Sequence, residues 1–95
     1  MKIQVIMFYV YILESLSNSN IYIGFTQDLK KRLREHNQGL SKSTEPHIPW
    51  RIIYYEACLC KADAKRREYY LKKSQGRRLI KRRLKEYFYM KKNKY

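Results

Sequence analysis

Two tyrosine-containing segments, followed by a helical segment with charge on its apolar side, constrain this chain more than any other feature. Residues 3–13 and 21–26 are rich in β-branched and aromatic residues, with Tyr-Val-Tyr-Ile in the first and Ile-Tyr-Ile-Gly in the second. A polar stretch rich in serine and asparagine separates them, which predicts an antiparallel hairpin. Thr26 or Asp28 is then placed to cap a helix that runs to about Asn37.

The periodicity of this helix places an arginine and a histidine among its leucines. Counting about 100° per residue from Leu29, Leu33 lies at about +40° on the helical wheel. Arg32 lies at about −60° and His36 at about −20°, so both share the apolar side that a sheet should cover. Because burying an unpaired charge is costly, this placement indicates a functional site on that side of the helix.

A third strand and a second helix are expected further along the chain. Residues 50–58 have the composition of a strand, in which Trp50, Ile52 and Tyr54 should share one face. A helix over about 62–73 should follow, with an acidic residue near its positive end.

The second helix also carries a charge on its inward side. With Ala64 as the reference, Leu71 lies at about −20° and Glu68 at about +40°. Neighbouring lysines and arginines can serve as salt-bridge partners for Glu68. Alternatively, a carboxylate among phosphate-binding charges can hold a divalent cation. Gly76 is expected to break the chain before a third helix over about 77–89.

Positive charge is concentrated in the C-terminal third of the chain. Residues 1–60 hold 7 Lys/Arg and 5 Asp/Glu, a net charge of +2, whereas residues 61–95 hold 15 and 3, a net charge of +12. So uneven a charge favours a polyanion, because each neutralised phosphate releases counterions. We therefore expect a nucleic acid as the partner. A well-solvated helical surface is the plain alternative, and an anionic membrane surface is a weaker one.

The cysteines and the apolar segments bear on location. Cys58 and Cys60 are too close in sequence for an unstrained disulfide, and a lone C-x-C motif is a poor zinc site. We expect both to be reduced and partly buried, as in a cytoplasmic protein. The apolar N-terminal run lacks a signal-peptide cleavage site, and no segment approaches the roughly 18 apolar residues of a membrane span.

Taken together, these residues resemble the signature of the GIY-YIG nuclease superfamily. Tyr-Val-Tyr at 9–11 and Tyr-Ile-Gly at 22–24 are similar to its two-part motif, and Arg32, His36 and Glu68 follow in the family's order. The chain most resembles short stand-alone members related to the N-terminal nuclease domain of the bacterial excision-repair C subunit.

The resemblance covers about residues 7–89 of a single 1–95 domain, in which 1–6 would be an extension and 90–95 a basic tail. It implies an α+β fold with a small three-stranded antiparallel sheet flanked by three helices, in the order β-β-α-β-α-α. It also implies hydrolysis of DNA phosphodiester bonds with one Mg²⁺ or Mn²⁺ ion. DNA is the implied partner, with RNA as an alternative. No membrane and no small-molecule cofactor is expected, and the oligomeric state stays open.

The resemblance implies a role for each site residue. Tyr11 and Tyr22 match the two tyrosines of the signature, with Tyr22 the first choice for activating water and Tyr11 for positioning. Arg32 matches the arginine that stabilises the charged phosphate, and Glu68 matches the metal ligand. His36 matches a histidine of some members and is a rival base.

Chemistry adds two expectations to these roles. A tyrosine with its ordinary pKa of about 10 is a poor base at neutral pH, so Arg32 and the metal should lower the pKa of the catalytic tyrosine. Gly24 should shape the site, because a missing side chain in a strand lets backbone or substrate come close. Contacts to nucleic acid are expected from the basic residues of the C-terminal helices, namely Lys65, Arg66, Lys72, Lys73, Arg77, Arg78, Lys81, Arg82 and Arg83.

Three departures from the family pattern leave other functions open. Tyr9 stands where the signature has glycine, and Phe25 where some members have lysine. The region 79–81 lacks the asparagine that many active members carry after the glutamate. A DNA- or RNA-binding module that retains the fold without efficient cleavage is therefore the alternative, and a basic accessory protein of a nucleoprotein assembly is the third reading.

Overall fold

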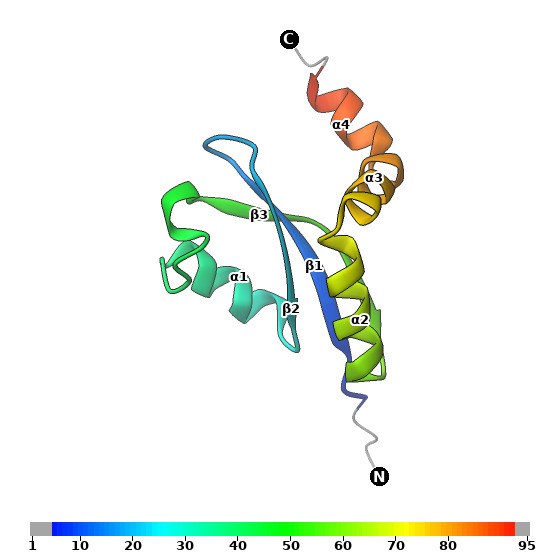
Figure 1. The fold of residues 1–95 in the computed structure, drawn as a ribbon. Coiled ribbons are helices and arrows are strands. Elements are labelled where there is room, and N and C mark those ends of the chain that lie inside the picture. Colours follow the sequence, from blue (N-terminus) through cyan, green and yellow to red (C-terminus); the bar gives the residue numbers. More distant parts are fainter. Residues whose placement is uncertain (1–4, 93–95) are drawn as a thin grey trace.

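A three-stranded antiparallel sheet organises residues 5–92, the part of the chain that the computed structural model describes (Figure 1). Its order is β2-β1-β3, so the first strand is central and pairs with both others. The elements are β1 (Phe8–Ser15), β2 (Ile21–Thr26), α1 (Leu29–Asn37), a 3-10 turn (Glu45–His47), β3 (Trp50–Cys58), α2 (Lys61–Leu71), α3 (Ser74–Arg83) and α4 (Lys85–Lys92). The predicted α+β fold is confirmed.

Helices cover the two faces of the sheet separately (Figure 1). Because side chains alternate along a strand, β1 sends Val10 and Ile12 to the α2 and α3 side, and Tyr11 and Leu13 to the α1 side. All four side chains are buried, as expected for a central strand covered on both faces. The face with Tyr11 carries the residues of interest.

The first strand runs from Phe8 to Ser15, so it begins later than its composition predicts and ends two residues later. Glu14 and Ser15 stay in the sheet because they pair with Arg51 and Trp50 of β3. The first two residues of the predicted 3–13 strand lie outside the described part of the chain. Within residues 5–92, no helix is long and apolar enough to cross a bilayer.

A β-bulge changes the faces of the third strand. Ile12 pairs with Tyr54 whereas Leu13 pairs with Ile52, so Ile53 is an extra residue in β3. Trp50 and Ile52 therefore pack on the α1 side, but Tyr54 packs on the opposite side. The prediction that Trp50, Ile52 and Tyr54 share one face is wrong for Tyr54, because strict alternation fails at a bulge.

The predicted break at Gly76 is also wrong, since α2 ends at Leu71 and Gly76 is buried inside α3. A Cβ on Gly76 would lie 2.2 Å from the carbonyl oxygen of Tyr70 and 2.4 Å from Cα of Leu71. The glycine is therefore required for close approach of α3 to the end of α2, and the turn between them falls at 72–73.

The expected third helix is divided at Leu84 into α3 and α4. Of the predicted basic tail, residues 90–92 belong to α4, and 93–95 lie outside the described residues. The side chain of Glu14, only 2% exposed, holds α4 against the sheet. It accepts hydrogen bonds from Tyr87 and from Nζ of Lys91, the latter at 2.5 Å, and lies 3.5 Å from Nη2 of Arg51.

Candidate active site

Tyrosines from two neighbouring strands lie together on the α1 side of the sheet. Tyr11 of β1 and Tyr22 of β2 face the same way, with ring centroids 6.3 Å apart. Tyr11 pairs across the sheet with Gly24, and a Cβ at Gly24 would lie 2.4 Å from both Cζ and the hydroxyl oxygen of Tyr11. The absence of a side chain at Gly24 thus lets the Tyr11 ring pack directly against the backbone of β2. In this structure the group that comes close to Gly24 is a side chain of the neighbouring strand.

Helix α1 supplies the polar partners of these rings. Asp28 caps it by accepting a hydrogen bond from the backbone N–H of Lys31. The Nε–H of Arg32 donates to the hydroxyl of Tyr11 at 3.4 Å, and Nε2 of His36 lies 2.8 Å from the same oxygen. The His36 ring also packs edge-on against Tyr22, with centroids 5.1 Å apart. The structure therefore brings together four of the residues singled out in the sequence.

Sequence reasoning missed Thr44, which completes this cluster from the loop before β3. It is fully buried, and its Oγ1 lies 2.7 Å from Nδ1 of His36. Its hydroxyl in turn donates to the carbonyl of Ser41 at 3.3 Å. The loop is held by Trp50, whose Nε1–H donates to the carbonyl of Thr44 at 2.8 Å. Only the buried polar His36, which must find partners, signals such a residue in advance.

The hydrogen bonds of this cluster run in one direction. The guanidinium of Arg32 can only donate, so it donates to the oxygen of Tyr11, and the carbonyl of Ser41 can only accept. We therefore assign the Tyr11 hydroxyl as donor to Nε2 of His36, and Nδ1–H of His36 as donor to Thr44. A neutral imidazole protonated at Nδ1 satisfies every partner.

The pKa values of the buried groups agree with this assignment. Burial raises the pKa of Tyr11 to about 12 despite the opposing hydrogen bond from Arg32, and Tyr22 and Glu68 raise it further by charge. Burial, followed by the charge of Arg32, lowers the pKa of His36 to about 4. Arg32 thus acts to lower the pKa of Tyr11, in the expected direction, but desolvation of the buried hydroxyl outweighs the cation.

Glu68 lies on α2, which packs on the other face of the sheet from the tyrosine cluster. Its side chain is 14% exposed, and it forms ion pairs with Lys65 at 3.3 Å and Lys72 at 3.0 Å. The negative charge of the Glu68 carboxylate makes a minor contribution to the raised pKa of Tyr11. Glu68 therefore combines the inward position and the lysine partners that its spacing suggested.

The residues predicted to bind nucleic acid divide into two groups. Those on α2 and its end are engaged within the protein: Lys65 and Lys72 pair with Glu68, Arg66 pairs with Asp63, and Lys73 lies over the Tyr69 ring. Those on α3 are exposed and form no ion pair within residues 5–92, namely Arg77, Arg78, Lys81, Arg82 and Arg83.

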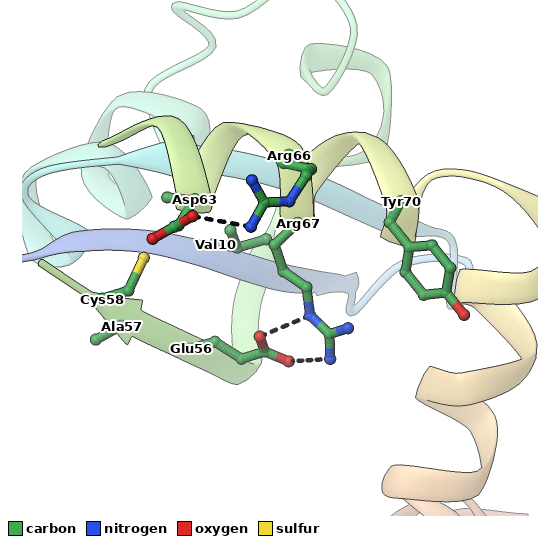
Figure 2. A pocket seen from close by; sticks show the side chains of 9 residues that line it. Val10, Glu56, Ala57, Cys58, Asp63, Arg66, Arg67 and Tyr70 are labelled. Atoms are coloured by element: carbon green, nitrogen blue, oxygen red, sulfur yellow. Dashed lines mark hydrogen bonds and ion pairs between the residues drawn. The ribbon is translucent and has the colours of Figure 1, made fainter. Parts of the chain in front are cut away.

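A separate cavity of about 520 Å³ lies between β3 and α2, away from the tyrosine cluster (Figure 2). Arg67 closes on Glu56 with two hydrogen bonds of 2.8 and 2.9 Å, and Arg66 closes on Asp63 at 2.8 Å. The charged side chains that line this cavity thus neutralise one another. Cys58 lies at this cavity with its thiol free, whereas Cys60 is exposed rather than partly buried as expected.

Comparison with known proteins identifies the family. The model of the GIY-YIG catalytic domain matches residues 7–81, which is most of the chain. The chain belongs to the GIY-YIG family. It is therefore a member of a nuclease-like family, and the tyrosine cluster lies inside the matched region.

Curated relatives of similar size are similar to this chain along most of their length. The UPF0213 protein CPE1444 of Clostridium perfringens is 42% identical over 66 residues, covering 68% of this chain and 70% of the relative. The UPF0213 protein SAG0778 of Streptococcus agalactiae is 41% identical over 61 residues, covering 63% and 68%. The solution NMR structure of the UPF0213 protein BH0048 from Bacillus halodurans is 31% identical, covers 78% and 81%, and has a TM-score of 0.48.

GIY-YIG nucleases generally use a divalent metal ion, so the donors available here matter. Within residues 5–92, no group of three or more His, Cys, Asp or Glu side chains is arranged to hold a metal. Mg²⁺ needs no such cage, because it is commonly held by one or two carboxylates, with waters and substrate phosphates completing its shell. The lone, partly exposed carboxylate of Glu68 fits that mode of binding.

Proposed function

We propose that this protein is a small divalent-metal-dependent endonuclease that hydrolyses DNA phosphodiester bonds. The observation that carries the proposal is the convergence of Arg32, Tyr11 and Tyr22, supported by the charge of Glu68 acting on Tyr11. A cation, two phenols and a carboxylate are the groups that phosphoryl transfer needs for charge neutralisation, positioning and ion binding. We also place the protein in the cytoplasm, and the free thiols of Cys58 and Cys60 support this.

Arg32 neutralises charge that develops on the phosphoryl oxygens. Its side chain is 31% exposed, so its guanidinium can reach substrate while Nε–H stays bonded to Tyr11. Glu35 holds Nη1 of Arg32 at 3.1 Å and so directs the guanidinium. A preorganised cation of this kind is effective because it does not have to reorient during the reaction.

The two tyrosines have different roles. The hydroxyl of Tyr11 is buried between Arg32 and His36 and keeps its proton at neutral pH, so Tyr11 positions rather than abstracts. The ring of Tyr22 is partly exposed, and within residues 5–92 no hydrogen bond engages its hydroxyl. Tyr22 is therefore the tyrosine that contacts the attacking water. His36, fully buried with both ring nitrogens bonded, positions Tyr11 and is not a base.

Glu68 is the residue that would hold the metal ion. The ion supplies Lewis-acid stabilisation of the phosphate when bound. Lys65 and Lys72 balance the carboxylate in its absence, which keeps a largely buried charge paired. The same two lysines can then bind the phosphates that flank the cleaved bond.

A nucleic-acid-binding module without efficient cleavage is the second candidate function. It is favoured by the pairing of Glu68 with two lysines, since both must release the carboxylate before a metal binds. It is also favoured by the region 79–81, which lacks the asparagine that many active members carry after the glutamate.

A nicking assay on supercoiled plasmid with Mg²⁺ or Mn²⁺ decides between the two. We expect the wild type to nick, and Arg32→Ala and Glu68→Ala to lose at least about a hundredfold in rate, as for loss of one electrostatic group in other enzymes. Arg34→Ala and Asp63→Ala are matched controls, because both residues are exposed on the same two helices. Wild type that does not nick, or nicking that survives both site substitutions, would overturn the nuclease proposal.

A further inference from the structure

A second hollow, of about 630 Å³, lies between the edge strand β2 and the helices α3 and α4. We call it the α4 groove. Its floor is apolar and is formed by Ile21, Ile23, Ile80 and Phe88. Ile23 and Ile80 are each 4% exposed and lie at the bottom, whereas Ile21 and Phe88 are partly exposed and line the opening.

The rim of the α4 groove carries positive charge alone. Arg77, Lys81, Lys85 and Lys92 line it, with no acidic residue among the lining side chains. Arg77 and Lys81 lie one turn apart on α3, Lys85 and Lys92 lie two turns apart on α4, and all four line the same hollow. Within residues 5–92 none of the four forms an ion pair, although Lys65, Lys72, Arg66, Arg67 and Lys91 all do. These cations are free to bind an external anion.

A ligand that fits both the basic rim and the apolar floor of the α4 groove must carry spaced negative charges and a flat apolar surface. A nucleic-acid duplex offers phosphates but keeps the faces of its bases stacked inside, so the floor would stay uncovered. An unpaired segment offers both, because its bases stack on aromatic side chains while its backbone follows a basic track. We propose that the α4 groove binds an unpaired segment of nucleic acid, with phosphates on the rim and a base against Phe88.

The ring of Phe88 is held ready for such a contact. Tyr87 packs edge-on against it, with ring centroids 5.3 Å apart, and Tyr87 is hydrogen-bonded to the buried Glu14. Lys91 ties the next turn of α4 to the same carboxylate at 2.5 Å. The groove is thus a supported feature of the fold, formed when α4 is fastened to the sheet.

The position of the groove relates it to the candidate active site. Tyr22 lies between Ile21 and Ile23 on β2, and its side chain points to the opposite face of the sheet. Because β2 is an edge strand, a chain seated in the groove reaches Tyr22 by passing around a single strand. The inference rests on the proposed function, and it narrows the substrate to DNA with an unpaired segment next to the cleaved bond.

An anionic membrane fits the α4 groove less well. Interfacial helices insert their apolar side chains beneath the headgroups, so those side chains must project beyond the cations. Here Ile23 and Ile80 lie recessed below the basic rim, where acyl chains do not reach. The shape therefore favours a ligand that enters a hollow.

Fluorescence anisotropy with labelled DNA in EDTA tests the groove without any cleavage. The probes are a short oligothymidylate, a blunt duplex of two complementary strands, and the same duplex with a single-stranded overhang. We expect the oligothymidylate and the overhang duplex to bind more tightly than the blunt duplex. Phe88→Ala should weaken binding of the first two by about tenfold and leave binding of the blunt duplex unchanged, since one stacked base is lost. Phe88→Trp should retain binding.

Two further variants keep the test decisive. Lys85→Gln, an exposed change that spares the core, should reduce the salt slope for oligothymidylate by about 0.7, the loss of one phosphate contact on a single strand. Tyr69→Ala removes an exposed aromatic of α2 outside the groove and should leave oligothymidylate binding as in the wild type.

Several results would overturn the groove. The proposal fails if Phe88→Ala weakens binding of the blunt and unpaired probes equally, or weakens binding of none of them. It also fails if Tyr69→Ala weakens binding as much as Phe88→Ala does. Loss confined to vesicles that contain phosphatidylserine would identify a lipid site instead. The binding measurements are made in EDTA, where no cleavage occurs, so failure of the nuclease proposal appears in the nicking assay and failure of the groove proposal appears in binding alone.

Discussion

The hydroxyl of Tyr11 lies 2.8 Å from Nε2 of His36, and this contact ties the central strand to α1 at the base of the candidate active site. The second ring nitrogen of His36 is hydrogen-bonded to Thr44, so the loop before β3 is fixed to the same histidine. A strand, a helix and a loop are thereby held in one arrangement. The geometry around Arg32 depends on this network, because its Nε–H shares the same hydroxyl.

Removing the two site hydroxyls should have unequal effects on stability. Tyr11→Phe leaves the buried acceptor Nε2 of His36 without a donor, so the free energy of unfolding should fall by about 1–2 kcal/mol. Tyr22→Phe removes a hydroxyl that makes no hydrogen bond within residues 5–92 and should cost less than about 0.5 kcal/mol. Urea unfolding of both variants measures the difference. Equal losses would contradict the network.

Stability should depend on pH through His36. Its pKa is about 4 in the folded protein against 6.5 for the unperturbed side chain, so the unfolded chain binds the proton first as the pH falls. The free energy of unfolding is therefore highest above pH 6.5 and falls by about 3 kcal/mol toward pH 4, at about 1.4 kcal/mol per pKa unit. Thermal unfolding across this range should show the loss.

The other histidine provides the control for this prediction. His36→Gln keeps two hydrogen-bonding atoms but cannot titrate, so the fall in stability between pH 6.5 and 4 should be much smaller. His47→Gln should leave the fall as in the wild type. The same steep fall in the His36→Gln protein would show that another group causes it.

A methyl group at Gly24 should disturb the site through Tyr11. The new Cβ would lie 2.4 Å from the Tyr11 hydroxyl oxygen, so the ring must move, and we expect Gly24→Ala to cost about 1–3 kcal/mol. In a Tyr11→Leu background the side chain is shorter and the same change should cost less. A double-mutant cycle by urea unfolding measures this coupling, and an additive result would contradict the steric explanation.

The buried carboxylate of Glu14 should control the order of α4. Glu14→Gln removes the charge that Lys91 and Arg51 face, and we expect α4 amides to lose about 1–3 kcal/mol of protection in hydrogen exchange. Glu86→Gln changes an exposed glutamate of α4 and is the matched control. Unchanged protection of α4 in Glu14→Gln would show that apolar packing alone holds this helix.

Helical spacing located much of the site in advance. The wheel placed Arg32 and His36 on the side of α1 that faces the sheet, and His36 is fully buried there. The same counting placed Glu68 inward on α2, and its side chain is largely covered. These predictions succeed because the direction of a side chain within a regular helix depends on local geometry alone.

The failed predictions for β3 and for Gly76 both occur where one element meets another. The bulge at Ile53 depends on how β3 pairs with β1, and Gly76 lies inside a helix because α3 crosses close to the end of α2. Glu14 finds Tyr87 and Lys91 more than seventy positions away along the chain. No local pattern reports such contacts, since long-range packing selects them.

The amino-acid sequence by itself determined the order of the elements up to α2, the family, and which sides of α1 and α2 face inward, because periodicity and composition act over a few residues. Only the tertiary structure decided that Tyr11 keeps its proton, that His36 is neutral, and that Thr44 completes their network. Those properties arise from burial and from partners on separate elements. The hydroxyl of Tyr11 is therefore fixed by the fold, whereas the side chain of Tyr22 stays partly exposed.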